Sequence, residues 1–254
     1  MEVHECVPVS LPPDETTAKG YDGPAGANKG RQRDSSLSDT GVIGLNIAIL
    51  GTGGVGAALG SRWGNAGHVV TYGSRTPQTE KVKLLVGHSG KGASAKTPPA
   101  AIAGADAILL AVPWPAAGET LAQLGDLSGR TLIDCTNPLL SDMSGIELGH
   151  VISAGEQIAA WAPGAGVVKA FNTASVKVML NPQFGEHRAT MFYCGDDAAA
   201  KLTVRQLIED IGFEPIDAGS LASSRYLEPL AMLYIHLAFR QGFGSNCAFK
   251  IMRR

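Results

Sequence analysis

An apolar run that breaks into a glycine-rich turn is the feature that most constrains how this chain folds. Residues 45–56 read LNIAILGTGGVG, and Gly51, Gly53 and Gly56 form the pattern G-x-G-x-x-G. In such a turn the first glycine permits a tight bend, the second lets the backbone approach a diphosphate, and the third lets a helix pack on the strand. The helix N-terminus then offers N–H groups to the anion. The pattern predicts a dinucleotide site; a turn that serves another nucleotide, or none, is the alternative.

Apolar runs and helical patterns alternate along the chain from residue 45, as they do in a parallel sheet covered by helices. Several runs are nearly continuous in Val, Ile and Leu, which is typical of strands buried on both faces. We therefore predict an α/β fold, a Rossmann-type doubly wound parallel sheet. The expected strands are 45–50, 68–73, 106–113, 131–137, 166–172, 189–195 and 214–219.

Three helices are predicted from apolar residues that repeat on one face. Caps and breakers set their ends: Asp196 or Asp197 is the expected N-cap of the second helix and Gly212 its stop, while Pro229 begins or kinks the third. The faces consist of Val55, Leu59 and Trp63 in the first helix, of Val204, Leu207, Ile208 and Ile211 in the second, and of Leu227, Leu230, Ala231 and Tyr234 in the third.

The composition excludes several classes of protein. Hydrophobic residues make up 44% of the chain and glycines number 32, which suits a compact α/β protein. A net charge of −2 gives no footprint for nucleic acid or an anionic membrane. The four cysteines are scattered without a C-x-x-C pair, so we expect no disulfide framework, no metal site and a reducing, cytoplasmic location. The most apolar stretch, residues 107–118, is too short to cross a membrane.

Residues 1–43 differ from the rest of the chain. They are polar, rich in Gly, Pro, Ser and Asp, and have no periodic apolar pattern. Such a segment cannot bury enough surface to offset its chain entropy, so we predict a disordered N-terminal tail. It lacks the apolar core of a secretory signal. A start codon assigned too far upstream explains the same composition.

The end of the second expected strand indicates which dinucleotide binds. Proteins that bind NAD usually place an Asp or Glu there, which holds the ribose 2′-hydroxyl. This chain reads Gly73-Ser74-Arg75-Thr76 instead, with no carboxylate. A planar guanidinium binds the 2′-phosphate that an acid would repel, and Ser74 and Thr76 add hydroxyl donors. The residues predict NADP; the alternative is that Arg75 is an ordinary solvated arginine.

Residues at the other strand ends are candidates because ligands of an open parallel sheet bind beyond the carboxyl ends of its strands. Trp114 follows Pro113 and lies either beside the cofactor or against the next helix. Residues 136–139, Thr-Asn-Pro-Leu, either face the ligand or form a plain turn. Asn172, followed by Thr173, either binds the nicotinamide carboxamide or the acceptor ring, or caps the helix of the segment SVKVML.

Four other polar residues are given structural interpretations. We expect Cys135 to be a small buried hydrophobe and His236 to be a satisfied core histidine. Arg225 and Glu228, spaced i, i+3, are interpreted as a helix surface pair. The sequence shows no Ser-His-Asp set, no Ser-x-x-x-Lys or Tyr-x-x-x-Lys pair and no metal cluster. A hydride that passes between two flat conjugated rings needs alignment more than a side-chain acid.

Taken together, these segments resemble one known family. IAILGTGGVGAALGSRWGNAGHVVTYGSR, AILLAVPW, LIDCTNPL, VVKAFNT and DAGSL…RYLEPLA are similar, in this order, to segments of the coenzyme F420-dependent NADP oxidoreductase family. The resemblance covers residues 45–250, and its first block, which ends in GSR, is the most specific part.

The resemblance implies an NADP-binding Rossmann domain over residues 44–175 and a small C-terminal α/β-to-helical part over residues 176–254 that closes the acceptor site. Hydride would pass between the nicotinamide and a deazaflavin or flavin-like ring stacked on it, and the protein would be a homodimer. The residues implied to bind NADP are Gly51, Thr52, Gly53, Gly54, Val55, Gly56, Ser74, Arg75, Thr76, Val112, Pro113, Trp114 and Asn172. Those implied at the acceptor are Pro138, Asn172, Thr173 and Leu221; no catalytic side chain beyond the candidate Asn172 is assigned.

Several alternatives stay open. Characterised deazaflavin reductases look to carry a His where this chain carries Asn172, so F420 and a flavin both stay open as co-substrate. The oxidoreductase domain of membrane-bound metalloreductases is also similar, which makes a ferric or flavin reductase an alternative. A carbonyl or imine reductase is another, although the roughly eighty residues after Asn172 are too few for the large helical domain of such enzymes. A non-catalytic NADP-sensing module is an alternative of a different class.

Overall fold

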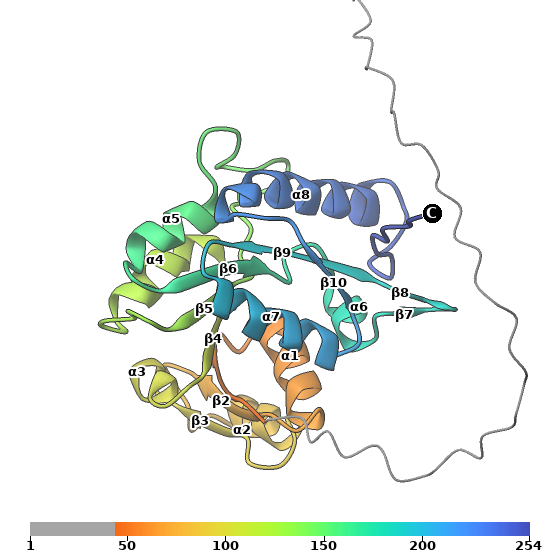
Figure 1. The fold of residues 1–254 in the computed structure, drawn as a ribbon. Helices are drawn as coiled ribbons and strands as arrows, with labels where there is room; N and C mark the ends of the chain where they lie inside the picture. The colour runs from red at the N-terminus through yellow and green to blue at the C-terminus, as the bar shows by residue number, and fades with distance from the viewer. Residues whose placement is uncertain (1–43) are drawn as a thin grey trace, which may run out of the picture. The chain divides into compact units, whose positions relative to one another are not determined.

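The computed structural model describes residues 44–254, which form a fold around one central sheet. The tail predicted for residues 1–43 lies outside the described residues. The eight strands of the sheet have the order β10-β9-β6-β5-β4-β1-β2-β3 (Figure 1). Neighbouring strands pair in parallel, except that β6 and β9 are antiparallel. The strands are β1 (Asn46–Leu50), β2 (Val69–Gly73), β3 (Ser94–Lys96), β4 (Ala107–Leu110), β5 (Thr131–Asp134), β6 (Gly166–Ala170), β9 (Thr190–Gly195) and β10 (Glu214–Asp217).

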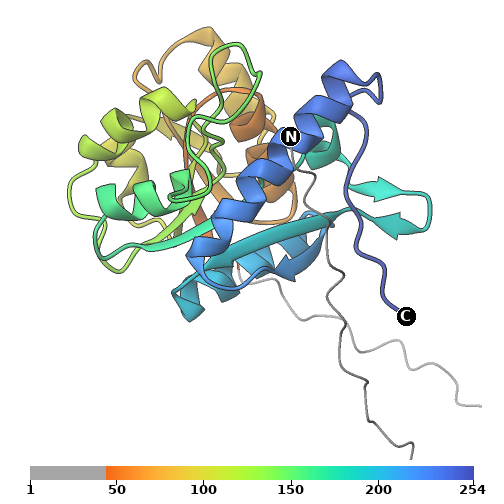
Figure 2. The ribbon, with the colours of Figure 1, turned by 90° about the horizontal axis from the view of Figure 1, so that it is seen from above.

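Helices cover both faces of this sheet because successive side chains of its central strands enter two different cores. Ile47 and Ile49 of β1 pack with residues of α1 and α7, whereas Ala48 and Leu50 pack with residues of α3, α4 and α5 (Figures 1 and 2). The predicted doubly wound α/β fold is confirmed. The helices are α1 (Gly54–Asn65), α2 (Glu80–Gly87), α3 (Pro98–Ile102), α4 (Trp114–Ala122), α5 (Ala154–Trp161), α6 (Val176–Leu180), α7 (Ala198–Asp210) and α8 (Ser224–Arg240), with a 3₁₀ turn η1 (Leu221–Ser223) before α8.

The three predicted helices form, and most residues of their predicted faces are buried, whereas Val55 and Leu230 are half-buried. In α1, Trp63 is fully buried and its Nε1 donates to the carbonyl oxygen of Leu207 in α7 at 2.9 Å. The side chain of Asp197 caps α7 by accepting from the N–H of Ala200 at 2.8 Å. The third helix, α8, begins at Ser224 and contains Pro229, so the proline does not begin it.

The prediction for His236 is wrong, because this side chain is exposed on α8. The buried residues Leu227, Ala231, Tyr234 and Ala238 recur at helical spacing on a different face of the helix. An apolar neighbourhood in the sequence therefore placed the histidine in the core, whereas the helical period turns it outward.

The sequence predicted a parallel sheet, which is wrong for β9, whose direction follows from the connection that precedes it. After β6 the chain passes through the short helix α6 and a projecting hairpin of β7 (Gln183–Phe184) and β8 (His187–Arg188). No long crossover helix intervenes, so β9 returns antiparallel to β6. Helix α7 then supplies the crossover that makes β10 parallel to β9. The edge strand β3 was missed because it is three residues long and partly polar.

The C-terminal segment extends the same sheet. The boundary expected at residue 175 falls between β6 and α6, and the described residues on its two sides belong to one compact unit. That residues 176–254 close an acceptor site stays a prediction. Within residues 44–254, no helix is both long and apolar enough to cross a membrane.

Candidate functional site

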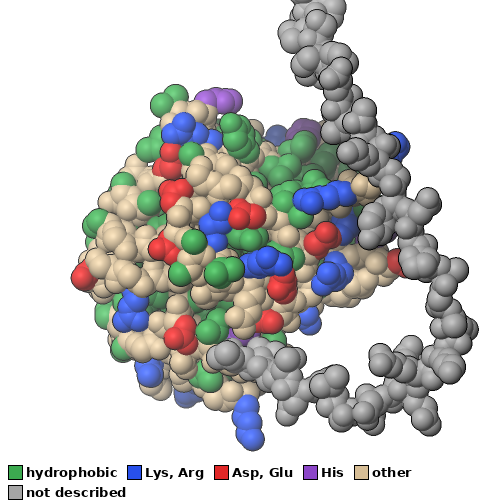
Figure 3. All heavy atoms as spheres, in the orientation of Figure 1, with side chains coloured by type: hydrophobic (Ala, Val, Ile, Leu, Met, Phe, Trp, Pro, Cys, Tyr) green, Lys and Arg blue, Asp and Glu red, His purple; other side chains and the backbone are tan. Residues whose placement is uncertain are grey.

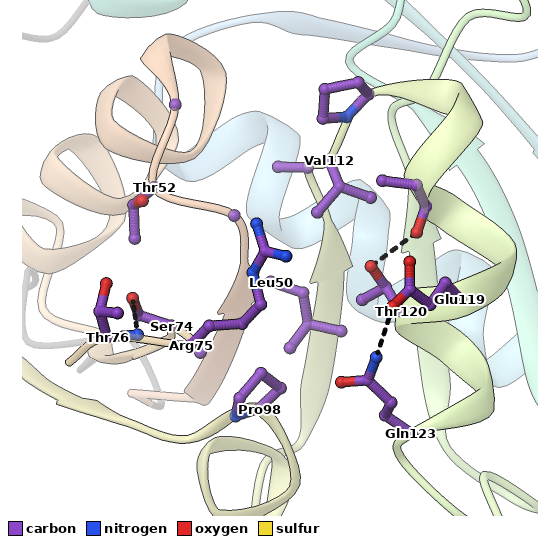
Figure 4. A pocket seen from close by; sticks show the side chains of 16 residues that line it. Leu50, Thr52, Ser74, Arg75, Thr76, Pro98, Val112, Glu119, Thr120 and Gln123 are labelled. Atoms are coloured by element: carbon purple, nitrogen blue, oxygen red, sulfur yellow. Dashed lines mark hydrogen bonds between the residues drawn. The ribbon is translucent and has the colours of Figure 1, made fainter.

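A cavity of about 320 Å³ opens at the carboxyl ends of β1, β2 and β4 (Figure 4). The glycine turn, the turn after β2 and the turn after β4 form its rim, and one face of α4 forms a wall. This is the crevice where open α/β sheets bind ligands. Its lining consists of Leu50, Gly51, Thr52, Gly53, Gly73, Ser74, Arg75, Thr76, Pro98, Ala111, Val112, Pro113, Ala116, Glu119, Thr120 and Gln123.

The glycines of the turn are needed for two different reasons. Gly51 has a φ of +124°, and a Cβ there would overlap the carbonyl oxygen of Ala111. A Cβ on Gly56 would overlap the carbonyl oxygen of Gly51. Gly53, in contrast, would place a Cβ in open space although it lines the cavity. The fold thus requires Gly51 and Gly56, whereas Gly53 leaves room for a ligand.

The N-terminus of α1 presents a positive dipole end beside Gly53. Gly53 is the N-cap residue, no side chain caps the helix, and its first turn contains no acidic residue. The first N–H groups of a helix lack partners within the helix, so they are available to an anion bound at this turn. Gly54, Val55 and Gly56 belong to this first turn and do not line the cavity themselves.

The turn after β2 places a cation in the cavity. Figure 4 shows the Arg75 side chain reaching into the cavity from this turn, with Ser74 and Thr76 beside it. Ser74 is nearly buried, and its Oγ accepts a hydrogen bond from the N–H of Thr76 at 3.2 Å. The acidic residue of the lining, Glu119, lies on the far wall, on α4 (Figure 4). The end of β2 therefore offers a cation and hydroxyl groups without a competing carboxylate.

The α4 wall was missed by the sequence interpretation. Ala116, Glu119, Thr120 and Gln123 share one helix face, and Gln123 Nε2 donates to Glu119 Oε1 at 3.4 Å. Their i, i+3, i+4 spacing is a signal, but it could be used only once α4 was known to flank the cavity. Pro98, at the start of α3, was also missed, because its place beside the cavity depends on the fold.

Trp114 lies at the start of α4 but does not line the cavity. Its ring stacks on Trp161 of α5, with the ring centroids 5.3 Å apart and an interplanar angle of 21°. The structure therefore favours the packing alternative for Trp114. Its neighbours Val112 and Pro113 do line the cavity.

Asn172 occupies the end of β6, away from this cavity, and forms a reciprocal pair with Asn137. Asn172 Nδ2 donates to Asn137 Oδ1 and to the carbonyl oxygen of Leu227, both at 3.1 Å, while Asn137 Nδ2 donates to the Asn172 carbonyl oxygen at 2.9 Å. Both amide protons of Asn172 are used, and its Oδ1 is buried without a partner. The Oγ1 of Thr136, at the end of β5, is also buried and unpartnered. Of the buried atoms at these two strand ends that lack a hydrogen bond, Asp134 Oδ2 lies 2.6 Å from Lys169 Nζ, whereas Asn172 Oδ1 and Thr136 Oγ1 are uncharged and unpartnered.

The backbone before Asn172 is strained. Phe171 is a buried residue with a φ of +61°, a conformation that a bulky L-residue rarely adopts. Such strain concentrates at functional sites. The alternative that Asn172 caps the next helix is wrong, since Ser175 caps α6 through its Oγ, which accepts from the N–H of Val178 at 3.3 Å.

The remaining acceptor candidates are buried: Pro138 and Thr173 lie next to these strand ends, whereas the Leu221 N–H donates to Asp196, which follows β9. Thr173 is 3% exposed and Leu221 is 6% exposed, and Pro138 is also buried. Leu221 packs in the core on the α4 and α5 face of the sheet. None of the three lines the cavity.

The interpretation of Arg225 and Glu228 as a surface pair is wrong. Glu228 is fully buried and contacts Lys169 of β6, with Glu228 Oε1 2.8 Å from Lys169 Nζ. Arg225 instead pairs with Glu156 of α5, its NH2 nitrogen lying 2.5 Å from Glu156 Oε1. The Arg225 guanidinium holds the pKa of Glu156 at about 2, below its usual range. Partners on another helix and on a strand replace the local i, i+3 contact.

The cysteines of the described residues are free, and two of them are shielded. Burial raises the pKa of the Cys135 thiol to about 12 and that of Cys194 to about 11. Cys135 is half-buried, so the expectation of a buried hydrophobe holds only in part, and its raised pKa disfavours the reactive thiolate. Residues 44–254 contain no group of His, Cys, Asp and Glu suited to hold a metal ion.

The fold and the cavity together define a dinucleotide-binding protein of the Rossmann class. The family model "NADP oxidoreductase coenzyme F420-dependent" matches residues 46–138. The F420-dependent NADP reductase of Methanothermobacter thermautotrophicus is 30% identical over 213 residues, which are 78% of this chain and 91% of that protein. The chain therefore belongs to the coenzyme F420-dependent NADP oxidoreductase family, a family of NADP-dependent oxidoreductases. The resemblance identified from the sequence is confirmed.

Two further similarities agree with this family. The crystal structure of a candidate F420-dependent NADP reductase from Arthrobacter sp. FB24 has a TM-score of 0.75 and 30% identity, covering 83% of this chain and all of that one (100%). The metalloreductase STEAP3 of Rattus norvegicus is 33% identical over 204 residues, which are 79% of this chain. The chain spans about two fifths of that metalloreductase, 39% of its length.

Proposed function

We propose that this protein is an NADPH-dependent oxidoreductase that transfers a hydride between the nicotinamide of NADP(H) and a deazaflavin, coenzyme F420, or a flavin-like ring. The observation that carries the proposal is the turn Ser74-Arg75-Thr76, which lines the same cavity as the glycine turn. A guanidinium and two hydroxyl groups suit a 2′-phosphate, and the N-terminus of α1 suits the diphosphate.

The site residues divide between the two halves of the cofactor. Gly51, Thr52 and Gly53 approach the diphosphate, and the first-turn residues Gly54, Val55 and Gly56 supply the N–H groups of α1 that face it. Ser74, Arg75 and Thr76 bind the 2′-phosphate. Val112 and Pro113 line the same cavity and are proposed to contact the cofactor between these two groups. Trp114 stacks on Trp161 outside the cavity and stabilises the α4–α5 contact.

We propose that the nicotinamide lies at the ends of β5 and β6. Asn172 Oδ1 is buried and unpartnered, so it accepts a hydrogen bond from the carboxamide amino group. Pro138, Thr173 and Leu221 surround the acceptor ring. The bound cofactor supplies the hydride, and the chain excludes water and aligns the two rings, which is what transfer between flat conjugated rings needs.

The acceptor is proposed to be F420 because the alignment with this chain extends over 91% of the F420-dependent methanogen reductase. A ferric or flavin reductase is the second candidate, favoured by the 33% identity to the metalloreductase. The test mixes the purified protein and NADPH with F420, FMN, FAD or a ferric chelate and follows the nicotinamide absorbance. Turnover with F420 or a flavin supports the proposal. Tight binding of NADPH without turnover of any acceptor would instead support a sensing module, and turnover of imines or ketones alone would support a carbonyl or imine reductase.

We also propose a cytoplasmic homodimer. Hydrophobic side chains gather over α8 in Figure 3, and Tyr226, Leu233, Phe239 and Phe243 are exposed on this helix and the turn after it. Tyr226 and Leu233 lie seven residues apart on one face of α8, and exposed apolar side chains on one helix face suit a protein partner, so a second copy is the proposed occupant. Light scattering of the wild type and of Leu233→Glu tests this: a dimer that becomes a monomer supports the proposal, and a monomeric wild type contradicts it.

A further inference from the structure

Three buried charged residues, Asp134, Lys169 and Glu228, lie next to the Asn137–Asn172 pair and are called the buried cluster below. Lys169 Nζ lies 2.6 Å from Asp134 Oδ2 and 2.8 Å from Glu228 Oε1. It also donates to the carbonyl oxygen of Thr136 at 2.8 Å. All three charged side chains are 0% exposed. The cluster joins β5, β6 and α8 at one point.

The charges of the buried cluster are compensated within the protein. Burial lowers the pKa of Lys169, but attraction by Asp134 and Glu228 outweighs this and leaves the pKa raised, so the ammonium form is retained. Glu228 also accepts from the N–H groups of Ala154 and Gly155, at 3.0 and 3.1 Å, at the N-terminus of α5. The positive end of that helix dipole therefore offsets the second carboxylate.

Stability alone does not explain such a cluster. Desolvating buried ions is costly, and apolar side chains of similar volume often hold secondary-structure elements together as well or better. Helix α8 already packs through Leu227, Ala231 and Tyr234, and Arg225 ties it to α5 nearer the surface. Because these contacts already hold α8, the buried cluster suits a role in fixing the positions of the groups next to it.

The buried cluster fixes the groups around Asn172 Oδ1 and Thr136 Oγ1, which lack hydrogen-bond partners. Asp134 Oδ1 accepts from the Thr136 N–H at 2.8 Å while Lys169 holds the Thr136 carbonyl, so the backbone is held on both sides of the Thr136 side chain. Leu227, which precedes Glu228, accepts from Asn172 Nδ2 through its carbonyl oxygen. The orientation of the Asn172 amide thus depends on where Glu228 anchors α8.

We propose that Lys169 and Glu228 are positioning residues that lock α8 and the Thr136 turn onto the end of β6 and so aim Asn172 Oδ1 and Thr136 Oγ1 at the nicotinamide carboxamide. In this arrangement Thr136 Oγ1 donates to the carboxamide oxygen and Asn172 Oδ1 accepts from its amino group. The inference rests on the proposed function, because it requires NADP(H) in the cavity.

The test compares two ligands that differ only at the nicotinamide. NADPH and 2′-phospho-ADP-ribose share the adenosine half, so the ratio of their dissociation constants reports on the nicotinamide end. Glu228→Gln removes the charge that faces Lys169, and its single amide oxygen can accept from one of the two α5 N–H groups, which in the wild type bind different carboxylate oxygens. We expect unchanged affinity for 2′-phospho-ADP-ribose, an NADPH advantage reduced about tenfold, and kcat reduced about tenfold or more, since misplacement by about 1 Å costs on the order of 100-fold.

Two further variants separate positioning from folding. Arg225→Met removes the neighbouring α8–α5 ion pair and should leave the NADPH advantage and kcat unchanged. A neutralised cluster, Asp134→Asn with Lys169→Met and Glu228→Gln, should regain the thermal stability that Glu228→Gln loses, but not its kcat or its NADPH advantage. The inference is wrong if thermal stability, kcat and the NADPH advantage all return in the neutralised cluster. It is also wrong if Glu228→Gln lowers the affinity for NADPH and for 2′-phospho-ADP-ribose equally, or lowers neither. If the wild type binds neither ligand, the proposed function is wrong and the inference falls with it.

Discussion

Replacing Arg75 by alanine should separate the two nicotinamide cofactors. None of the ion pairs among residues 44–254 involves Arg75, and its side chain is exposed, so the substitution should leave the fold and its stability almost unchanged. The same side chain lines the cavity between the glycine turn and α4. What the variant loses is therefore a ligand contact and not a structural one.

The size of the effect follows from the chemistry of the contact. Hydrogen bonds to a charged group contribute about 1.5–3 kcal/mol, and the exposed position of Arg75 favours the lower half of that range. A loss of about 1.5–2 kcal/mol corresponds to a dissociation constant for NADPH that rises roughly 10- to 30-fold. NADH has no 2′-phosphate, so its dissociation constant should change less than about threefold.

Calorimetric titration of both cofactors into the wild type and into Arg75→Ala provides the measurement. Lys96→Ala is the matched control, because Lys96 is an exposed cation on the neighbouring strand β3 that does not line the cavity. This control should keep the wild-type preference for NADPH. An equal loss of affinity for NADPH and NADH in Arg75→Ala would refute the reasoning, as would a wild type without preference between them.

Three further predictions concern the glycine turn, acid stability and thiol reactivity. Gly51→Ala should lower the unfolding free energy by about 2–4 kcal/mol in denaturant titrations, because its φ is +124° and a Cβ there has no room. Gly53→Ala should unfold like the wild type and yet bind NADPH more weakly. The Glu156 pKa of about 2 lies below its usual 4.5, so its ion pair stabilises the fold above pH 4.5 and is lost as the pH falls toward 2. After allowance for solvent, the stability advantage over Glu156→Gln should shrink by about 1 kcal/mol in that window. Cys135 and Cys194, with pKa values of about 12 and 11, should resist iodoacetamide near pH 8 until the protein is denatured, as peptide mass mapping would show; labelling of either in the folded protein would contradict the raised pKa of its thiol.

Features that depend on neighbours along the chain could be predicted from the sequence. The glycine turn was identified because strand, bend and helix are consecutive, and the cation at Arg75 was placed because it directly follows a strand. The sequence narrowed the cap of α7 to Asp196 or Asp197, between which the structure decides, and spacing predicted most of the buried faces of α1 and α7. The carboxyl ends of parallel strands meet at one edge, so these local readings also placed the cavity.

Features that depend on which distant groups meet could not be predicted in this way. Glu228 was assigned to the helix surface because Arg225 lies one turn away, whereas its partner is Lys169 of β6. Likewise, Trp114 precedes a helix in the sequence, but only the packing of α4 on α5 decides that it faces Trp161. His236 shows the converse error, since apolar neighbours in the sequence do not fix the face on which a residue lies.

The sequence by itself determined the α/β architecture and the anion-binding bend, because periodicity and backbone freedom are local properties of the chain. Only the tertiary structure decided the antiparallel return of β9, the α4 wall of the cavity and the burial of three charged side chains beneath Asn172. Each of these requires two or more elements to come together, and the energy of a contact between polar groups depends on the partners and on the water that folding removes.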